Sequence, residues 1–160
     1  MVNRMKHPSR QWDETSVLAA LAEASDTGST AVARRLLDFA TGLGADLDWN
    51  KGPRPHVRIR FPLNGSSPRV MSIYTYPTLG GYKDGFVAVN INSFHNKIAP
   101  QLLSSFITML RKSPWLADEM SDLEAANYER EPSLRLDYLE AHPEELTVVE
   151  DALRLLIERG

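Results

Sequence analysis

His56–Asn92, HVRIRFPLNGSSPRVMSIYTYPTLGGYKDGFVAVNIN, is the segment that decides the fold of this chain of 160 residues. It contains three runs rich in Val, Ile, Tyr and Phe, the residue types that favour strands, and turn-forming residues separate the runs. The runs are His56–Phe61, Arg69–Tyr76 and Phe86–Asn92. An Asn-Gly pair after the first run supplies the backbone conformations of a tight reversal. The segment therefore predicts an antiparallel meander.

The second connection of the meander, residues 77–85, is longer than the first and contains three glycines. Its central residues are Leu79, Gly80, Gly81 and Tyr82. This composition would place apolar side chains on a backbone with few steric restrictions. The connection can form a flap that binds a partner, but a plain surface loop is the more common structure for such a segment.

Apolar residues at helical spacing lie on both sides of the meander. Within residues 115–142, residues 116–128 fit a short acidic helix, whereas residues 134–139 fit both the strand period and the helix period. The clearer elements are helices at residues 13–25, 29–41 and 99–112, a last helix that begins at Pro143, and a strand at 45–50. This order predicts an α+β fold, with two N-terminal helices, an antiparallel meander sheet of three or four strands, then two or three C-terminal helices.

The composition is that of an ordinary globular protein with a single domain, residues 1–160. Residues 1–10 are polar and basic, and we expect them to form a flexible tail. The sequence contains no run of ~18 apolar residues, so it predicts no membrane span. The N-terminus does not resemble a signal peptide. Cysteine is absent, which excludes disulfides and thiolate metal sites. We therefore expect a cytoplasmic protein without a membrane partner.

Side chains alternate between the two faces of a strand, so the meander should have an apolar face and a polar face. The polar face would collect cationic, aromatic and amide side chains: Arg54 beside the sheet, and His56, Arg58, Arg60, Tyr74, Tyr76, Phe86, Asn90 and Asn92 on it. Guanidinium groups bind phosphates, aromatic rings stack on bases and Asn reads polar edges. This face therefore predicts binding of single-stranded nucleic acid.

Charge is distributed unevenly along the chain. Residues 1–112 contain 14 Lys and Arg against 8 Asp and Glu, whereas residues 113–160 contain 4 against 13. A basic surface for an anionic partner is one interpretation. The alternative is internal pairing, in which acidic residues of the C-terminal part cover the polar face. The acidic residues considered for this role are Asp118, Glu119, Asp122 and Glu124.

His95 follows the last predicted strand, close in sequence to Asn92 and Lys97. A general base can occupy such a strand end, but an exposed loop residue is the favoured interpretation. The histidines lack metal-ligand spacing, and no nucleotide-binding or nucleophile motif occurs. Asp46 and Asp48 lack the remaining residues of a nuclease-like site. The sequence therefore predicts no catalytic residue, no metal and no cofactor.

Trp12 with its acidic neighbours, Trp49-Asn-Lys-Gly, and Glu131-Pro-Ser-Leu-Arg-Leu-Asp-Tyr-Leu occur in this order around the paired helices and the meander. The order resembles an uncharacterised bacterial domain that is often joined to predicted restriction-type nucleases or other DNA-related modules. The chain departs from that pattern at Asn50, where such domains usually carry a second glycine. The resemblance implies an accessory or recognition role and transfers no catalytic residues.

Three functional hypotheses follow from these observations. The first is a non-enzymatic module that binds nucleic acid or a protein partner through the face with Arg58, Arg60 and Tyr74. The second is a protein-interaction or homodimeric subunit that uses the glycine-rich flap or a sheet edge. The third and least favoured is an enzyme centred on His95.

Overall fold

The computed structural model describes residues 11–24, 27–51, 55–75 and 85–160. Several residues named above lie outside these ranges: the predicted tail at residues 1–10, Arg54, Tyr76 and the flap residues Leu79, Gly80, Gly81 and Tyr82. Within the described ranges, none of the helices combines the length and the apolar character that a membrane span requires.

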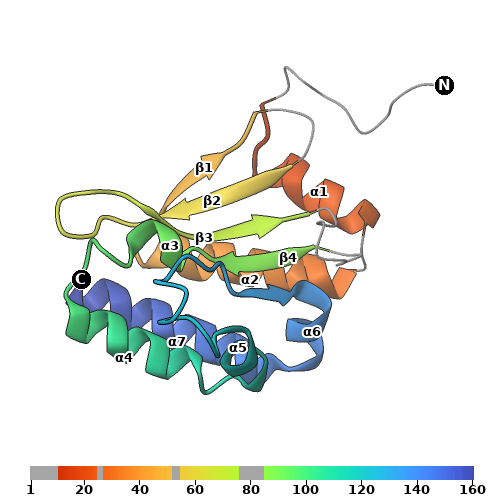
Figure 1. Cartoon of the computed structure of the whole chain (residues 1–160). Coiled ribbons are helices and arrows are strands. Elements are labelled where there is room, and N and C mark those ends of the chain that lie inside the picture. Colours follow the sequence, from red (N-terminus) through yellow and green to blue (C-terminus); the bar gives the residue numbers. More distant parts are fainter. Residues whose placement is uncertain (1–10, 25–26, 52–54, 76–84) are drawn as a thin grey trace.

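A sheet of five strands in the order β1-β2-β3-β4-β5 is present in the described part of the chain, and each neighbouring pair is antiparallel. The strands are β1 (Asp46–Trp49), β2 (His56–Arg60), β3 (Arg69–Tyr74), β4 (Phe86–Val89) and β5 (Ser133–Arg135). Figure 1 shows β1 to β4 succeeding one another across the sheet. The predicted meander and the additional strand before it are therefore confirmed.

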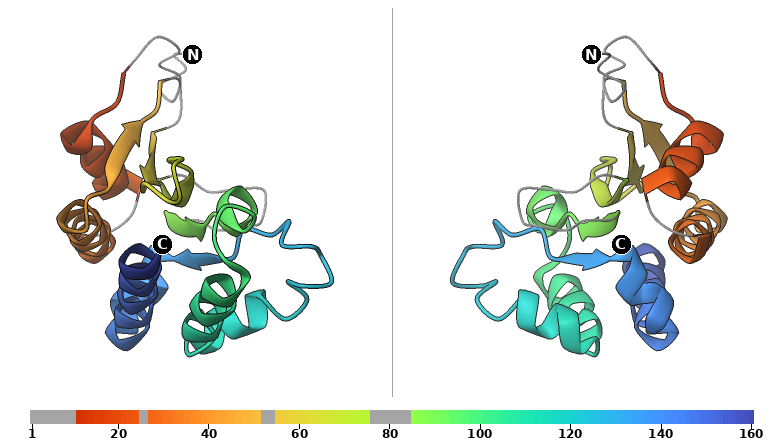
Figure 2. Two further views of the ribbon diagram at one scale, coloured as in Figure 1. Left: turned by 90° about the vertical axis from the view of Figure 1, so that its left-hand side faces the viewer. Right: turned by 90° about the vertical axis from the view of Figure 1, so that its right-hand side faces the viewer.

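Helices pack mainly against one face of this sheet. They are α1 (Glu14–Ala24), α2 (Thr27–Gly42), α3 (Ile91–Phe94), α4 (Pro100–Leu110), α5 (Pro114–Glu119), α6 (Leu136–Ala141) and α7 (Pro143–Arg159). In Figure 1, α1 and α2 lie behind the sheet and α4 and α7 lie below it. Figure 2 shows α3 on the opposite side of the sheet from α1 and α2. The predicted α+β class, with helices before and after an antiparallel sheet, is confirmed.

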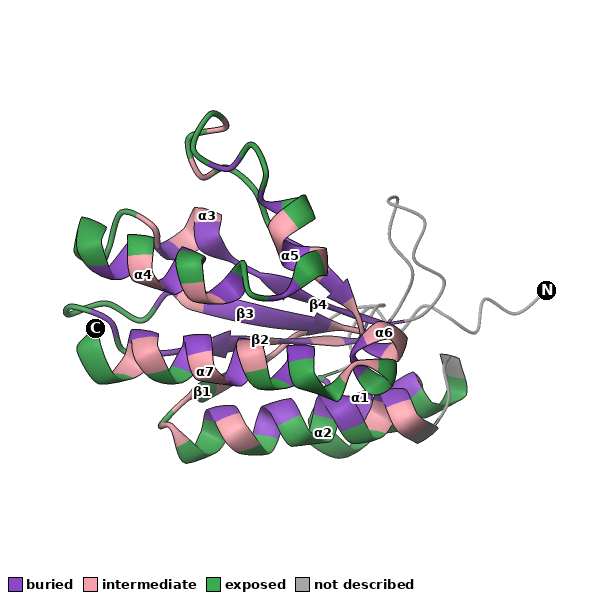
Figure 3. Ribbon diagram, turned by 90° about the horizontal axis from the view of Figure 1, so that it is seen from below, coloured by how far each residue is buried: buried purple, intermediate pink, exposed green. Residues whose placement is uncertain are grey.

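The apolar face of the sheet and the inner sides of the helices form the core. Val57 and Ile59 of β2 are fully buried, and Ile73 and Met71 lie opposite them in β3. Figure 3 shows β3 and β4 largely buried, whereas α2, α4 and α7 carry alternating buried and exposed stripes. The half-buried Arg58 between Val57 and Ile59 follows from the two-residue period of the strand.

The strand predicted at Phe86–Asn92 is wrong at its C-terminal end, because β4 stops at Val89 and is followed by the short helix α3. Asn90 has a ψ of 54°, which turns the chain out of the strand. The Asn90 carbonyl oxygen accepts a hydrogen bond from the Ser93 N–H at 2.9 Å and closes the turn. Asn92 therefore lies on a helix and not on a strand.

The segment that fitted more than one pattern, residues 115–142, contains β5. β5 pairs with β4 in the register Phe86–Arg135, Val87–Leu134 and Ala88–Ser133. Leu134 has no exposed surface, so β5 contributes to the core although it has only three residues. The acidic C-terminal part of the chain thereby adds the fifth strand.

Candidate functional site

The strand register brings residues of the predicted polar face into two rows across the sheet. The first row contains His56, Tyr74, Phe86 and Arg135, each directly opposite the next. The second row contains Asp48, Arg58, Ser72, Ala88 and Ser133. The two rows therefore lie on one face of the sheet, but this face is covered at β3 and β4, where Ser72, Phe86 and Ala88 are buried.

Rings of the first row stack on one another. The His56 and Tyr74 ring centroids are 5.1 Å apart, and those of Tyr74 and Phe86 are 4.8 Å apart. Phe86 is only 5% exposed, whereas His56 and Tyr74 are half-buried. The predicted aromatic residues are therefore brought together, but stacking on each other uses ring surface that bases would otherwise contact.

The row continues beyond the sheet through residues that the sequence analysis did not identify. The Arg135 guanidinium carbon lies 5.7 Å from the centroid of the Trp115 ring. Trp115 in turn contacts Tyr138, with centroids 4.5 Å apart, and Tyr138 stacks on His142 at 4.1 Å. The sequence could have indicated this continuation only by placing Arg135 on a strand. It does not do so, because β5 has only three residues and shows no clear period.

Tyr138 and Ser113 hold a buried carboxylate at the end of this row. Glu145 is 4% exposed and accepts hydrogen bonds from both hydroxyl groups. The hydrogen bond to Glu145 raises the pKa of Tyr138 to about 12, since it favours the neutral phenol. This cluster ties α6 and α7 to the residue that caps α5.

Two arginines of the polar face have different environments. Arg60 Nε lies 3.2 Å from Asp48 Oδ2, and its Nη1 donates to the Ser67 carbonyl oxygen at 3.1 Å. Arg58 Nε is buried and has no hydrogen-bond partner within the described ranges. Arg58 as a whole residue is half-buried.

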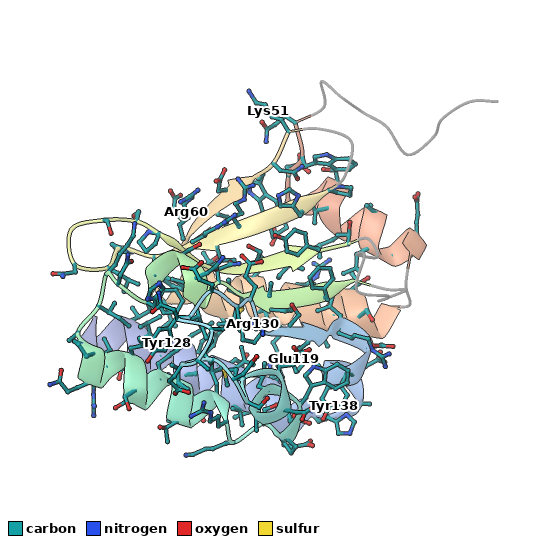
Figure 4. All side chains as sticks on the ribbon, in the orientation of Figure 1. Lys51, Arg60, Glu119, Tyr128, Arg130 and Tyr138 are labelled. Carbon is teal, nitrogen blue, oxygen red and sulfur yellow. The ribbon has the colours of Figure 1, made fainter. Side chains whose placement is uncertain are left out.

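Further cationic groups lie near Arg58 and Arg60. Arg69 is opposite Arg60 in the register and donates from Nε to Ser93 Oγ at 3.0 Å. Lys51 is exposed just beyond β1. In Figure 4, Lys51 and Arg60 lie on the β1–β2 side of the sheet. Positive charge is therefore concentrated over the first three strands.

The two asparagines of the predicted face occupy other positions. Asn90 is fully buried; its Oδ1 accepts from Ser72 Oγ at 2.8 Å, and its Nδ2 donates to Glu131 Oε1 at 3.0 Å. These contacts hold the turn after β4 and leave Asn90 without access to an external partner. Asn92 is half-buried on α3.

The acidic segment before β5, residues 118–131, reaches the margin of the polar face near β4. Glu131 contacts Asn90 there. Asp122 pairs with Arg130 at 2.5 Å and Glu124 with Arg111 at 3.4 Å. Glu131 therefore contacts the β4 end, while Asp122 and Glu124 pair with arginines outside the sheet and Arg60 on β2 pairs with a carboxylate of the sheet itself.

Another ion pair does join the basic and acidic parts of the chain. Arg35 on α2 donates two hydrogen bonds to the carboxylate of Glu150 on α7, at 2.7 and 3.0 Å. The hydrogen bond with Glu150 raises the pKa of Arg35. Internal pairing thus accounts for part of the charge distribution at the helices.

His95 lies immediately after α3 and is half-buried. Its ring stacks on Tyr128, with centroids 5.3 Å apart. Tyr128 belongs to the acidic segment and has a positive φ of 60°. The structure thus gives His95 a packing contact with the segment that precedes β5.

A scan against protein-family models, a search of curated proteins and a search of solved structures each found no match to this chain. The interpretation of the site therefore depends on the geometry of the polar face.

Proposed function

We propose that this protein is a binding module that holds single-stranded nucleic acid against the basic half of its polar face. This half comprises Lys51, Arg58, Arg60 and Arg69. The observation that supports the proposal is the environment of Arg58. A buried cationic donor without a partner is costly, because it has lost solvation and gained no hydrogen bond. A phosphate beside the terminal nitrogens of Arg58 would supply the opposite charge that this guanidinium group lacks.

Neighbouring cations support the same ligand. Arg60 and Arg69 lie over adjacent strands, and Lys51 is exposed at the edge. A phosphate backbone carries one charge per nucleotide, so several separated cations can contact it at the same time. His56 and Tyr74 lie beside Arg58 on this face, and bases attached to the bound backbone would contact the parts of these rings that their mutual stacking leaves exposed.

The test is fluorescence anisotropy with a labelled single-stranded oligonucleotide of ~15 nucleotides, comparable to the larger sites of sheet-based single-strand binders. We expect salt-dependent binding. Arg58→Gln should weaken it about tenfold, as expected for one charged hydrogen bond, and should reduce the salt slope by about 0.7.

Arg130→Gln is the matched control, because Arg130 is an arginine already paired with Asp122 beside the β4 end of the sheet. It should leave the affinity within about twofold of the wild type. Circular dichroism verifies that both variants fold. An affinity that does not change with ionic strength, or an equal loss of affinity in both variants, would show that this face is not the binding site.

A further inference from the structure

The pairing of β2 with β3 places two arginines directly opposite each other. The two strands pair without interruption as far as Ile59, which faces Met71. In an uninterrupted pairing Arg60 would face Val70, but the register shifts at this point and Arg60 faces Arg69. Val70 is therefore the extra residue of a β-bulge, and the bulge brings together two like charges that a regular pairing would not place opposite each other.

This arrangement is unfavourable for the sheet alone. Like charges directly opposite each other on neighbouring strands destabilise a sheet, whereas bulges occur preferentially next to functional sites, where they redirect a side chain. Carboxylates of β1 lie on the Arg60 side of the pair, since Asp48 pairs with Arg60 and Asp46 faces it in the register. Arg69 forms no ion pair in the part of the chain that the structure describes. An external anion would therefore neutralise the charge of Arg69.

Hydrogen bonds orient both guanidinium groups. Arg69 Nε donates to Ser93 Oγ at 3.0 Å, and Ser93 belongs to α3, which lies on the side of the sheet away from α1 and α2 (Figure 2). Arg60 uses Nε for Asp48 and Nη1 for the Ser67 carbonyl oxygen. Within the described ranges, these contacts leave Arg60 Nη2 and both terminal nitrogens of Arg69 without an acceptor. Their N–H groups can donate to a ligand on the polar face.

The arginine pair lies at one end of that face. Arg60 is the last residue of β2 and Arg69 is the first residue of β3, whereas His56 and Tyr74 lie at the other ends of the same strands. Arg58 lies between these ends on β2. A nucleic-acid strand that contacts the rings and Arg58 would reach the arginine pair at the margin of the face, which suits the end of the strand.

The donors of the pair also suit the phosphate that such an end can carry. A phosphodiester within a strand has one negative charge, whereas a terminal phosphate has between one and two at neutral pH and offers three acceptor oxygens. The planar guanidinium group of Arg69 can donate two parallel hydrogen bonds to a phosphate. Arg60 Nη2 would supply a further donor, and the Ser93 hydroxyl group has a hydrogen of its own to donate.

We propose that Arg60, Arg69 and Ser93 bind the terminal phosphate of a single nucleic-acid strand, and that the following phosphates of the strand lie toward Arg58. The inference rests on the proposed function, because it names the part of the ligand that this end of the polar face holds. It adds a preference for phosphorylated ends, which a uniform basic surface would lack.

The test compares three forms of the same oligonucleotide of ~15 nucleotides by fluorescence anisotropy. One form has a 5′-phosphate, one has a 3′-phosphate and one has hydroxyl groups at both ends, with the label at an end that is not being compared. We expect the phosphate at one end to raise the affinity about tenfold, the effect of one charged hydrogen bond. The phosphate at the other end should change it less than twofold, because the strand binds in one direction.

The outcomes separate this inference from the proposed function. Equal affinity for all three forms, or an equal gain from a phosphate at either end, would overturn the inference and leave binding of single strands intact. If none of the three forms binds, both proposals are rejected. These comparisons use the wild-type protein, so they do not depend on the folding of any variant.

Variants locate the phosphate on the face. Arg69→Gln should reduce the preference for the phosphorylated end to less than about twofold, and Ser93→Ala should reduce it about threefold. Arg130→Gln is again the matched control, because Arg130 pairs with Asp122 outside the sheet, and it should retain the full preference. Circular dichroism verifies that each variant folds. A preference that persists in folded Arg69→Gln would overturn the assignment.

Discussion

Arg60 Nε lies 3.2 Å from Asp48 Oδ2 on the adjacent strand, whereas the buried Nε of Arg58, two residues earlier on β2, has no hydrogen-bond partner among the described residues. The two arginines occupy equivalent positions in the alternation of the strand. Because Asp48 neutralises one of them, they should contribute unequally to the binding of an anion.

Asp48→Asn tests this inequality. The substitution removes the carboxylate that competes with a phosphate for Arg60, so affinity for single-stranded nucleic acid should rise severalfold and the salt slope should increase by about 0.7. The Asp48–Arg60 pair is partly exposed, so the free energy of unfolding should change by less than about 1 kcal/mol. Anisotropy and urea unfolding measure the two effects. Unchanged affinity in Asp48→Asn would show that Arg60 does not contact the ligand.

Tyr138→Phe removes one of the two hydroxyl donors to buried Glu145. We expect the free energy of unfolding to fall by about 1 kcal/mol at neutral pH, which is at the low end for a charged hydrogen bond. The effect is small because the Tyr138 side chain is half-buried and water competes for its hydroxyl group. Urea unfolding measures the change. Ser72→Ala, which removes the hydroxyl donor to Asn90, serves as the comparison for loss of a hydrogen bond outside this cluster.

The same phenol gives the protein a predictable response to alkali. Its pKa is raised to about 12, so the stabilisation from the neutral phenol is complete below its ordinary pKa of about 10 and is lost as the pH rises through about 12. The wild type should therefore lose more stability than Tyr138→Phe over this interval. An ultraviolet titration that detects no tyrosine with a raised pKa would contradict the hydrogen bond.

Gly85→Ala should destabilise the protein by about 1–3 kcal/mol. A Cβ at Gly85 would lie 2.7 Å from the Tyr74 carbonyl oxygen and 2.8 Å from Leu21 Cδ1, so the backbone of β3 or β4 would have to move. Gly42→Ala is the matched control, because no atom beyond its chain neighbours and the backbone of its own helix lies within 4 Å of its added Cβ. That change should stabilise the protein by about 0.4–1 kcal/mol through the unfolded state. Thermal unfolding of both variants compares them, and equal shifts in midpoint would exclude the steric argument.

Leu134→Ala tests the contribution of the three-residue strand β5. Leu134 is fully buried opposite Val87, so its truncation should lower the free energy of unfolding by about 2–5 kcal/mol. Ser133→Ala in the same strand should change it by less than about 1 kcal/mol, since Ser133 is half-buried and its hydroxyl bonds only locally to the Glu131 carbonyl oxygen. Denaturant unfolding distinguishes the two, and a small effect of Leu134→Ala would indicate that β5 is peripheral to the core.

Local patterns predicted the elements that are long enough to show a period. β2 alternates buried Val57 and Ile59 with half-buried Arg58, and a period of two residues is sufficient to separate the faces. The apolar stripe of α4 and the first-turn proline of α7 likewise identified those helices. Asn90 departs from its local pattern, because its buried contact with Ser72 and its contact with Glu131 come from residues distant in sequence.

By itself, the sequence determined the α+β class, the meander and the alternation that puts His56, Arg58 and Tyr74 on one face, because these depend on periodicity within each strand. Only the tertiary structure decided which cations are paired. Asp48 lies opposite Arg58 in the register of β1 on β2, but its carboxylate pairs with Arg60 on the diagonal, and Glu131 lies at the end of β4 because β5 joins the sheet there. Strand register and long-range pairing are properties of the whole fold, since each depends on residues far apart in the chain that pack together only once the core has formed.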